Sequence, residues 1–299
     1  MAYHVPVLLR ESIDGLDIKP NGIYVDLTFG GGGHSAEILK RLGKKGKLFA
    51  FDQDEEAMKN DPNDKRLKLI RSNFRYFRNF LRYHNVPEVD GILADLGVSS
   101  HHFDSSERGF SFRFEGPLDM RMNRNARMTA RKVVNTYDKE ELGRILIQYG
   151  ELQGSGKLAA AICKSREVTP FETVEQLASV LKPFFPIQQQ NKMLAQVFQA
   201  IRIEVNQEME VLKQMLLNTP KSLVKEGRLV VISYHSLEDR LVKNFLKCGN
   251  FEGVEKKDFY GNVETPFELV NKKIITPSPD EVKENNRARS AKLRIGKRL

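Results

Sequence analysis

The feature that most constrains this chain is the alternation of short apolar runs with helical stretches over its first hundred residues. A helix is expected over residues 35–42, after the first run, and another is expected to begin at Glu55, after the second. Strands that alternate with helices are typical of a parallel sheet covered on both faces. The sequence therefore predicts an α/β fold with a doubly wound, mostly parallel sheet. Its first four strands are expected at Ile23–Leu27, Leu48–Asp52, Leu67–Arg71 and Gly91–Leu96.

The fifth apolar run, Arg228–Ser233, comes more than a hundred residues after the fourth, although a crossover in such a sheet needs only a few tens. The intervening stretch has helical periodicity, because Val197, Ile201 and Val205 recur every four residues. Pro183 is expected to end another helix there. An inserted helical domain explains this spacing better than one long crossover. The predicted domains are a discontinuous one of residues 1–105 and 216–299 and an inserted one of residues 106–215.

Net charge narrows the class of partner. Lys and Arg exceed Asp and Glu by 48 to 39, which gives a formal net charge of +9. Such an excess favours a polyanionic partner, because neutralised phosphates release their counterions. A basic enzyme without such a partner remains open at this point.

Cysteine content and apolar runs indicate the compartment. The two cysteines, Cys163 and Cys248, form neither a disulfide framework nor a zinc site, which favours a reducing cytoplasm. The start of the chain lacks the features of a signal peptide. No apolar run approaches the roughly 18 residues that span a bilayer. We therefore expect a soluble, cytoplasmic protein without a membrane partner.

A glycine-rich loop, Gly30–Gly33, follows the first predicted strand and precedes a helix. Glycine lets the backbone approach a ligand closely, and the first N–H groups of the helix face that ligand. Asp52 ends the second strand, where a carboxylate accepts hydrogen bonds from ribose hydroxyls. These residues indicate a nucleoside cofactor, but they do not separate S-adenosylmethionine from NAD. A loop that serves only as a tight turn is the alternative.

Two further segments lie at the same predicted edge of the sheet. Asp95 ends the fourth strand, where open α/β sheets bind their ligands, so it is placed to hold a cofactor or to accept a hydrogen bond from an amine. Capping of the next turn is the alternative. The segment Ser233–Arg240 follows the fifth strand, and its His, Glu and Asp do not have the spacing of a metal site. Ser236 is expected to cap a helix there.

Three segments suit contact with nucleic acid. Arg108–Phe112 and Pro117–Met122 place arginines beside aromatic and methionine side chains, which suits phosphate contact and base stacking, although a Phe–Met cluster is also typical of a core. Residues 285–299 contain six basic residues and no acidic one. They are expected to form either a solvated tail or an arm that contacts phosphates.

Eight short motifs follow one another along nearly the whole chain. They are His4–Glu11, Gly30–Ser35, Asp95–Ser100, Arg108–Phe112, Pro117–Met122, Phe198–Asn206, Ser233–Arg240 and Asn286–Ala291. This ordered set resembles the bacterial MraW-type family, the cytosine-N4-methyltransferases of small-subunit ribosomal RNA. The resemblance implies a class I, Rossmann-like methyltransferase fold with a helical insertion for substrate recognition. It also implies S-adenosylmethionine as the cofactor and a cytidine in the ribosomal decoding region as the target.

The resemblance further implies cofactor contacts and partners. The matching positions are Gly32, Gly33, His34, Asp52, Phe74, Asp95 and His102. The family usually has Gln at the position of His102, and a Pro-Ala-Thr-Arg run where this chain has residues 193–197. The implied partner is small-subunit ribosomal RNA or the assembled small subunit, and homodimer formation is left open.

The residues present agree with methylation of an amine. The N4 lone pair of cytosine is delocalised into the ring, so the enzyme has to align the amine with a sulfonium methyl group and accept a hydrogen bond or proton. A sulfonium needs no metal for activation, and Asp95 is the first choice for the acceptor. Methylation at ring carbon 5 normally uses a cysteine nucleophile, and neither cysteine lies in a predicted strand-end loop. An NAD-dependent dehydrogenase and a non-catalytic RNA-binding assembly factor are the rival interpretations.

Overall fold

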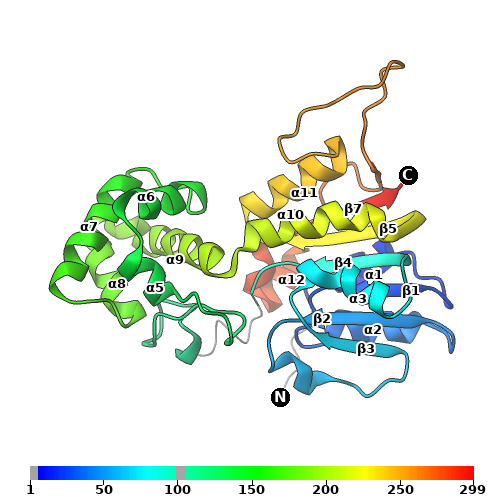
Figure 1. Ribbon diagram of the computed structural model, residues 1–299, viewed down its shortest axis with the longest axis horizontal. Helices are drawn as coiled ribbons and strands as arrows, with labels where there is room; N and C mark the ends of the chain where they lie inside the picture. The colour runs from blue at the N-terminus through cyan, green and yellow to red at the C-terminus, as the bar shows by residue number, and fades with distance from the viewer. Residues whose placement is uncertain (1–5, 99–105) are drawn as a thin grey trace. The chain divides into compact units, whose positions relative to one another are not determined.

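The computed structural model describes residues 6–98 and 106–299, which form two compact units (Figure 1). The sheet unit comprises Met1–Gly97 and Met209–Leu299, and the helical unit comprises Val98–Glu208. Both limits of the helical unit lie several residues before the predicted 106 and 215. The second limit is earlier because Leu212, Met215 and Leu216 of the following helix are buried in the core of the sheet unit.

A seven-stranded sheet with the order β3-β2-β1-β4-β5-β7-β6 forms the centre of the sheet unit. Neighbours among β1 to β5 are parallel, whereas β7 pairs antiparallel with both β5 and β6. This arrangement confirms the predicted doubly wound, mostly parallel sheet and its first five strands. The strands are β1 Ile23–Asp26, β2 Lys47–Asp52, β3 Leu67–Arg71, β4 Val89–Asp95, β5 Leu223–Ser233, β6 Phe267–Leu269 and β7 Lys292–Arg298.

Strand β7 corrects both expectations for residues 285–299, which form neither a solvated tail nor a free arm. Lys292 pairs with Ser233, and the register continues along β5 to the pair of Lys297 with Arg228. Leu293 and Ile295 alternate with basic residues and are buried, so one face of the strand belongs to the core. Lys292, Arg294 and Arg298 lie on the other face of the strand, whereas Arg287 and Arg289 belong to the preceding η7.

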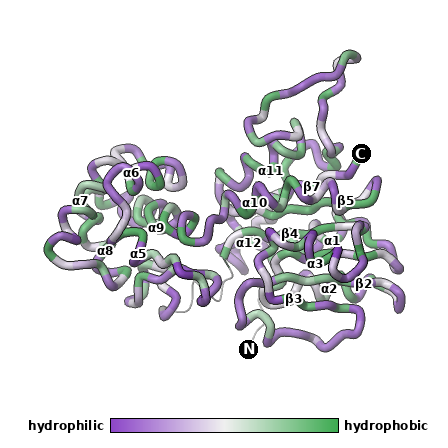
Figure 2. Tube along the Cα trace, in the orientation of Figure 1, coloured by the Kyte–Doolittle hydropathy of each residue, from purple (hydrophilic) through white to green (hydrophobic). Residues whose placement is uncertain are grey.

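Helices cover both faces of the sheet. Val230 packs in the cluster that contains α1 and α2, whereas its neighbour Val231 packs in the cluster that contains α3, α10 and α11. Figure 2 shows hydrophobic residues concentrated along the central strands. The α-helices of this unit are α1 Leu9–Gly15, α2 Gly33–Arg41, α3 Phe77–Tyr83, α10 Glu208–Asn218, α11 Ser236–Cys248 and α12 Pro279–Glu284. The 3-10 helices are η1 Ala57–Asn60, η2 Phe74–Tyr76, η6 Thr219–Lys221 and η7 Asn286–Ser290.

The helix expected to begin at Glu55 is only the single 3-10 turn η1. Pro62 follows two residues after its end, and proline disfavours helical geometry in the residue before it. The chain therefore extends from Asp61 and enters β3 at Leu67.

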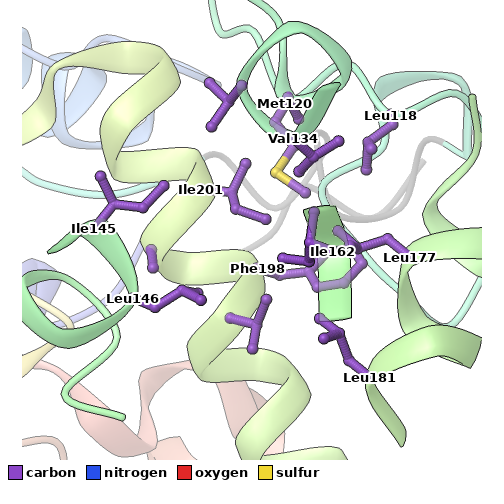
Figure 3. Packing of buried hydrophobic residues seen from close by; sticks show 14 of the residues in the cluster. Leu118, Met120, Val134, Ile145, Leu146, Ile162, Leu177, Leu181, Phe198 and Ile201 are labelled. Atoms are coloured by element: carbon purple, nitrogen blue, oxygen red, sulfur yellow. The ribbon is translucent and has the colours of Figure 1, made fainter. Parts of the chain in front are cut away.

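The helical unit has a core of its own. Val197, Ile201 and Val205 of α9 are buried, which confirms the predicted apolar stripe, and α8 ends at Leu181, before Pro183. Figure 3 shows Phe198 and Ile201 among the side chains of this core. None of the helices that the structure describes is long and apolar enough to cross a membrane. The elements are η3 Ser106–Arg108, α5 Ala130–Thr136, α6 Lys139–Gln148, α7 Ser155–Val168, α8 Val174–Leu181, η4 Lys182–Phe184, η5 Ile187–Gln189 and α9 Gln190–Asn206.

Candidate active site

The glycine-rich loop joins the end of β1 to the start of α2. Gly32 has a φ of 78°, a left-handed conformation that glycine adopts without strain. A side chain at Gly33 would clash with the Cγ atom of Pro6, so glycine is needed at this close approach. A side chain at Gly31 would instead meet no atom within 4 Å, so the backbone there borders open space. This loop can therefore bring backbone N–H groups close to a ligand.

Asp52, the last residue of β2, lies beside this loop. Its Oδ2 atom accepts a hydrogen bond of 2.9 Å from the backbone N–H of Gly30, and its Oδ1 atom accepts one of 2.8 Å from Asp54. The carboxylate thus connects the end of β2 to the glycine loop. Phe74 begins η2, beyond the next strand of the sheet, and is half-buried against the core.

Asp26 ends β1 and is the most enclosed carboxylate at this edge. It is 1% exposed, and its two oxygens accept hydrogen bonds from the Ser35 hydroxyl (2.7 Å) and from the Thr28 backbone (3.0 Å). Burial raises the pKa of Asp26, and these hydrogen bonds offset part of the rise. Sequence analysis did not single out this residue. Its contacts hold the glycine loop on the end of β1.

Asp95 ends β4, the strand next to β1. Its backbone N–H donates to the Thr28 hydroxyl at 2.7 Å, and its Oδ1 atom accepts a hydrogen bond of 2.8 Å from the Tyr234 hydroxyl. Its Oδ2 atom lies 3.8 Å from Nδ1 of His34. Burial raises the pKa of Asp95 to about 6, although His34 and the hydrogen bond from Tyr234 act in the opposite direction. The side chain keeps 24% exposure, so it combines a raised pKa with access to a ligand.

His34 lies in the first turn of α2 and is 6% exposed. Its Nε2 atom lies 3.2 Å from the carbonyl oxygen of Val7, which assigns the proton of the neutral ring to Nε2. Burial lowers the pKa of His34, and the neighbouring Asp95 charge acts in the opposite direction. The Nδ1 atom of the ring faces Asp95.

The sequence reasoning also did not single out Tyr234, whose hydroxyl donates a hydrogen bond to Asp95. Tyr234 directly follows β5 within Ser233–Arg240, a segment in which the sequence reasoning considered only the His, Glu and Asp side chains and a serine cap. Burial and then the nearby Asp95 charge raise the pKa of Tyr234 well above its usual value. The hydroxyl therefore stays protonated and donates a hydrogen bond to Asp95. An aromatic hydroxyl directly after a strand at the ligand-binding edge is the signal that could have identified it.

The other residues of Ser233–Arg240 have structural roles. His235, not Ser236, is the N-cap of α11, and its side chain and that of Glu238 form a reciprocal capping box. The expected cap lies one residue too late because Ser236 already belongs to the helix. Asp239 forms an ion pair with Arg294 of β7 at 2.7 Å.

The basic and aromatic segments are largely core. Phe110, Met120 and Met122 are buried in the helical unit, so the core interpretation of this Phe–Met cluster is confirmed over base stacking. Arg108 is 3% exposed and donates hydrogen bonds to the carbonyls of Arg121 and Met122. Of the predicted cofactor contacts, His102 lies outside the described residues, and so do positions 99 and 100 of the Asp95–Ser100 motif.

Comparison with known proteins places this site in a family. The sequence model of the MraW methylase family matches residues 1–299. A ribosomal RNA small subunit methyltransferase H of Phocaeicola vulgatus is 62% identical over 296 residues, which cover 99% of this chain and 97% of the relative. The protein of the same name from Bacteroides fragilis strain YCH46 is 60% identical over the same length and with the same coverage.

Among solved structures, an rRNA methylase from Streptococcus thermophilus aligns with a TM-score of 0.44 at 12% identity, covering 100% of this chain and 99% of that one. The match to the family over the whole chain confirms the predicted methyltransferase that uses S-adenosylmethionine, and it excludes the NAD-dependent dehydrogenase. The chain belongs to the MraW methylase family.

Proposed function

We propose that this protein transfers the methyl group of S-adenosylmethionine to the exocyclic N4 amine of a cytidine in the decoding region of small-subunit ribosomal RNA. The names and high identity of its relatives support the RNA target. One structural observation supports the chemistry. It is the Asp95 carboxylate, which accepts a hydrogen bond from Tyr234 at the carboxyl end of β4 and lies beside His34.

The residues at this edge fit the cofactor. The glycine loop leaves open space at Gly31, and Asp52 offers a carboxylate next to it, as a nucleoside ligand requires. The bound cofactor supplies an electrophilic methyl group on a positively charged sulfur, and the carboxylates of Asp26 and Asp95 make this edge favourable for a cation. We assign cofactor binding to Gly32, Gly33, His34, Asp52, Phe74, Asp95 and His102.

The roles of His34 and Asp52 differ in kind. The ring of His34 is directed inward to Val7 and Asp95, so its contribution to cofactor binding comes from its backbone N–H in the first turn of α2. Asp52 contributes its carboxylate, which accepts hydrogen bonds from ribose hydroxyls while it holds the glycine loop.

Asp95 is the proposed catalytic residue. A carboxyl with a pKa of about 6 is mostly ionised at pH 7, so it can accept a hydrogen bond from N4 and then the proton that the methylated amine releases. This hydrogen bond orients the amine, which is a weak nucleophile, towards the methyl group. Neither cysteine is placed to attack a base, because Cys163 lies in α7 and Cys248 is the buried last residue of α11.

We assign a different function to each of the two compact units. In this proposal the sheet unit binds the cofactor and performs methyl transfer, and the helical unit recognises the RNA. The substrate is either free RNA or the assembled small subunit, and one experiment distinguishes them.

Purified protein is incubated with labelled S-adenosylmethionine and either deproteinised small-subunit RNA or intact small subunits, both from cells that lack this gene. We expect one methyl group per RNA molecule in at least one of the two substrates, and nucleoside analysis by mass spectrometry should identify N4-methylcytidine. Binding of RNA without transfer would return the protein to the class of non-catalytic assembly factors. A methyl group on carbon 5 would contradict the proposed acceptor chemistry.

A further inference from the structure

One loop of the helical unit concentrates positive charge. Residues 121–132 contain five basic side chains and no acidic one. This segment consists of the loop that follows the buried Met120 and the first residues of helix α5, and the tip of the loop is residues 123–127. The arginines in and around this tip fall into two groups, which differ in burial and in partners.

The first group holds the loop in place. Arg121 forms a two-pronged ion pair with Asp119, with distances of 2.8 and 2.7 Å, and its Nη1 atom donates to the carbonyls of Arg124 and Ala126 at 2.7 and 2.8 Å. One guanidinium thus fixes the path of the tip from inside. The buried Arg108 donates to the carbonyls that precede the tip.

Asn206, at the end of α9, fixes the base of the same loop. Its side-chain oxygen accepts a hydrogen bond of 2.8 Å from the backbone of Met122, and its side-chain nitrogen donates to the carbonyl of Met120 at 2.8 Å. Within the tip, the Asn123 side chain accepts a hydrogen bond from the backbone of Asn125. The backbone of residues 120–126 is therefore held by side chains from both sides.

The second group faces solvent. Arg124 and Arg127 are exposed, and among the residues that the structure describes neither guanidinium has an ion pair or a side-chain hydrogen bond. Arg131, which is also exposed, differs because it pairs with Glu172 at 2.7 Å. A well-anchored loop thus displays two like charges that form no ion pair with the described residues. Such an arrangement is stabilised by an external polyanion, and guanidinium groups match phosphate oxygens in a two-pronged geometry.

We propose that loop 123–127 is a phosphate-contacting surface of the helical unit, in which Arg124 and Arg127 bind the backbone of the substrate RNA. This inference rests on the proposed function, because it takes RNA as the substrate. The exposed pair takes the role of phosphate contact, which the sequence offered as one interpretation of the segments Arg108–Phe112 and Pro117–Met122.

The test compares the double variant R124Q/R127Q with the wild-type protein. Binding to a fragment of small-subunit RNA is measured by fluorescence anisotropy from about 50 to 200 mM salt. We expect roughly tenfold weaker binding at the lowest salt, and a slope of log affinity against log salt that is flatter by about 1.5 for two lost phosphate contacts. Calorimetry should show unchanged affinity for S-adenosylmethionine, because the substitutions lie outside the sheet unit.

Two further variants make the result specific. K157Q/K164Q removes the same charge from exposed positions of α7 in the same unit and should bind RNA nearly as the wild type does. R124K/R127K keeps the charge and should retain the salt slope while it loses part of the affinity. An unchanged slope in R124Q/R127Q, or an equal loss in K157Q/K164Q, would overturn the assignment of this loop.

The outcomes also separate this inference from the proposed function. If the wild-type protein forms N4-methylcytidine while R124Q/R127Q binds RNA normally, the loop assignment fails and the proposed function stands. If the wild-type protein transfers no methyl group to RNA, the proposed function fails regardless of the loop. A loss that occurs only with intact subunits and not with naked RNA would indicate a protein contact and would overturn the phosphate assignment.

Discussion

At the scale of single residues, the three carboxylates at the ligand-binding edge have different surroundings and therefore different tasks. Asp26 is enclosed and holds the glycine loop, whereas Asp52 connects that loop to the next strand. Only Asp95 combines partial exposure with a side-chain hydroxyl donor and a neighbouring imidazole. Burial opposes its ionisation, and the hydroxyl of Tyr234 favours it. The protonation of Asp95 is therefore the property that this site controls.

The first prediction concerns Tyr234→Phe. The substitution removes a hydrogen bond to the charged form of Asp95, so the pKa of Asp95 should rise further above about 6. A hydrogen bond to a charged group corresponds to a shift of about one pH unit. If ionised Asp95 accepts the proton, the acidic limb of the kcat profile should move to higher pH by this amount. Activity lost at pH 6 should largely return at pH 8.

The control for this prediction is Tyr24→Phe, which removes another enclosed hydroxyl of the sheet unit. The Tyr24 hydroxyl accepts a hydrogen bond from the backbone of Lys19 and donates to the carbonyl of Asp17, away from Asp95. Its pH profile should match that of the wild type. The other groups near Asp95 are His34, Asp26 and Glu238, and both variants leave them in place. A uniform loss of activity at every pH in Tyr234→Phe would show that the hydroxyl does not act through the Asp95 charge.

The second prediction is that Asp52→Ala weakens binding of S-adenosylmethionine about ten- to a hundredfold, since charge-assisted hydrogen bonds to ribose are each worth roughly 1.5–3 kcal/mol. Isothermal titration calorimetry provides the measurement. Asp90→Ala is the matched control, because Asp90 also accepts a backbone hydrogen bond, from Ile23, but near the opposite end of β4. Equal affinities in the two folded variants would remove Asp52 from the cofactor site.

The sequence predicted part of this site because the ends of buried strands can be recognised from the apolar runs that precede them. Asp52 and Asp95 each close an apolar run, and parallel strands bring such ends to one edge. The contact between Asp95 and Tyr234 joins residues 139 positions apart, and no local pattern reports it. The inward direction of the His34 ring depends on the Val7 carbonyl, which only the folded chain places there. The positions of these side chains along the sheet edge were thus predictable, whereas their hydrogen-bond partners and protonation states were not.

At the scale of elements, β5 was predictable from the sequence, whereas β7 was not predicted. Strand β5 contains an unbroken apolar run, Leu229–Ile232, and is buried on both faces, so its pattern predicts a central strand. In β7 apolar residues alternate with Lys and Arg, and the high charge density suggested a tail instead. Gly296 adds a second signal, because a side chain there would lie 2.6 Å from Leu246. Alternation with a period of two was the evidence that should have outweighed charge.

The third prediction tests the role of β7 in the core. Leu293 is fully buried, so Leu293→Ala should lower the free energy of unfolding by about 2–5 kcal/mol. Leu299→Ala makes the same chemical change at a terminal residue that is 49% exposed, and surface substitutions usually change stability by less than about 0.5 kcal/mol. Chemical denaturation of both variants gives the comparison. Equal stabilities would mean that β7 contributes no packing and that residues 285–299 act as a tail after all.

At the scale of the whole molecule, the helical unit interrupts the chain between β4 and β5. Strand β4 ends in Asp95, and Tyr234 directly follows β5. The two partners of this hydrogen bond therefore lie on either side of the insertion in the sequence. The sheet unit has its own core and brings them together. Asp95 and the described residues assigned to cofactor binding lie in that unit. Of the two cysteines, Cys163 belongs to the helical unit and Cys248 ends the helix after β5.

The last prediction follows from these positions: methyl transfer proceeds without a covalent bond between enzyme and base. Methylation at carbon 5 requires a cysteine thiolate that adds to the ring, whereas an amine needs only an acceptor for its proton. The double variant with Cys163→Ser and Cys248→Ala should therefore keep its turnover within a few-fold, allowing for the altered packing at the buried Cys248. Asp95→Ala should lose most of its activity, and Asp95→Asn should retain more, because its carbonyl still accepts a hydrogen bond.

RNA that carries 5-fluorocytidine should be methylated on N4 and should not become trapped on the protein, since the fluorine blocks only chemistry at carbon 5. A folded cysteine variant without turnover, or a stable protein–RNA adduct, would refute direct transfer to the amine.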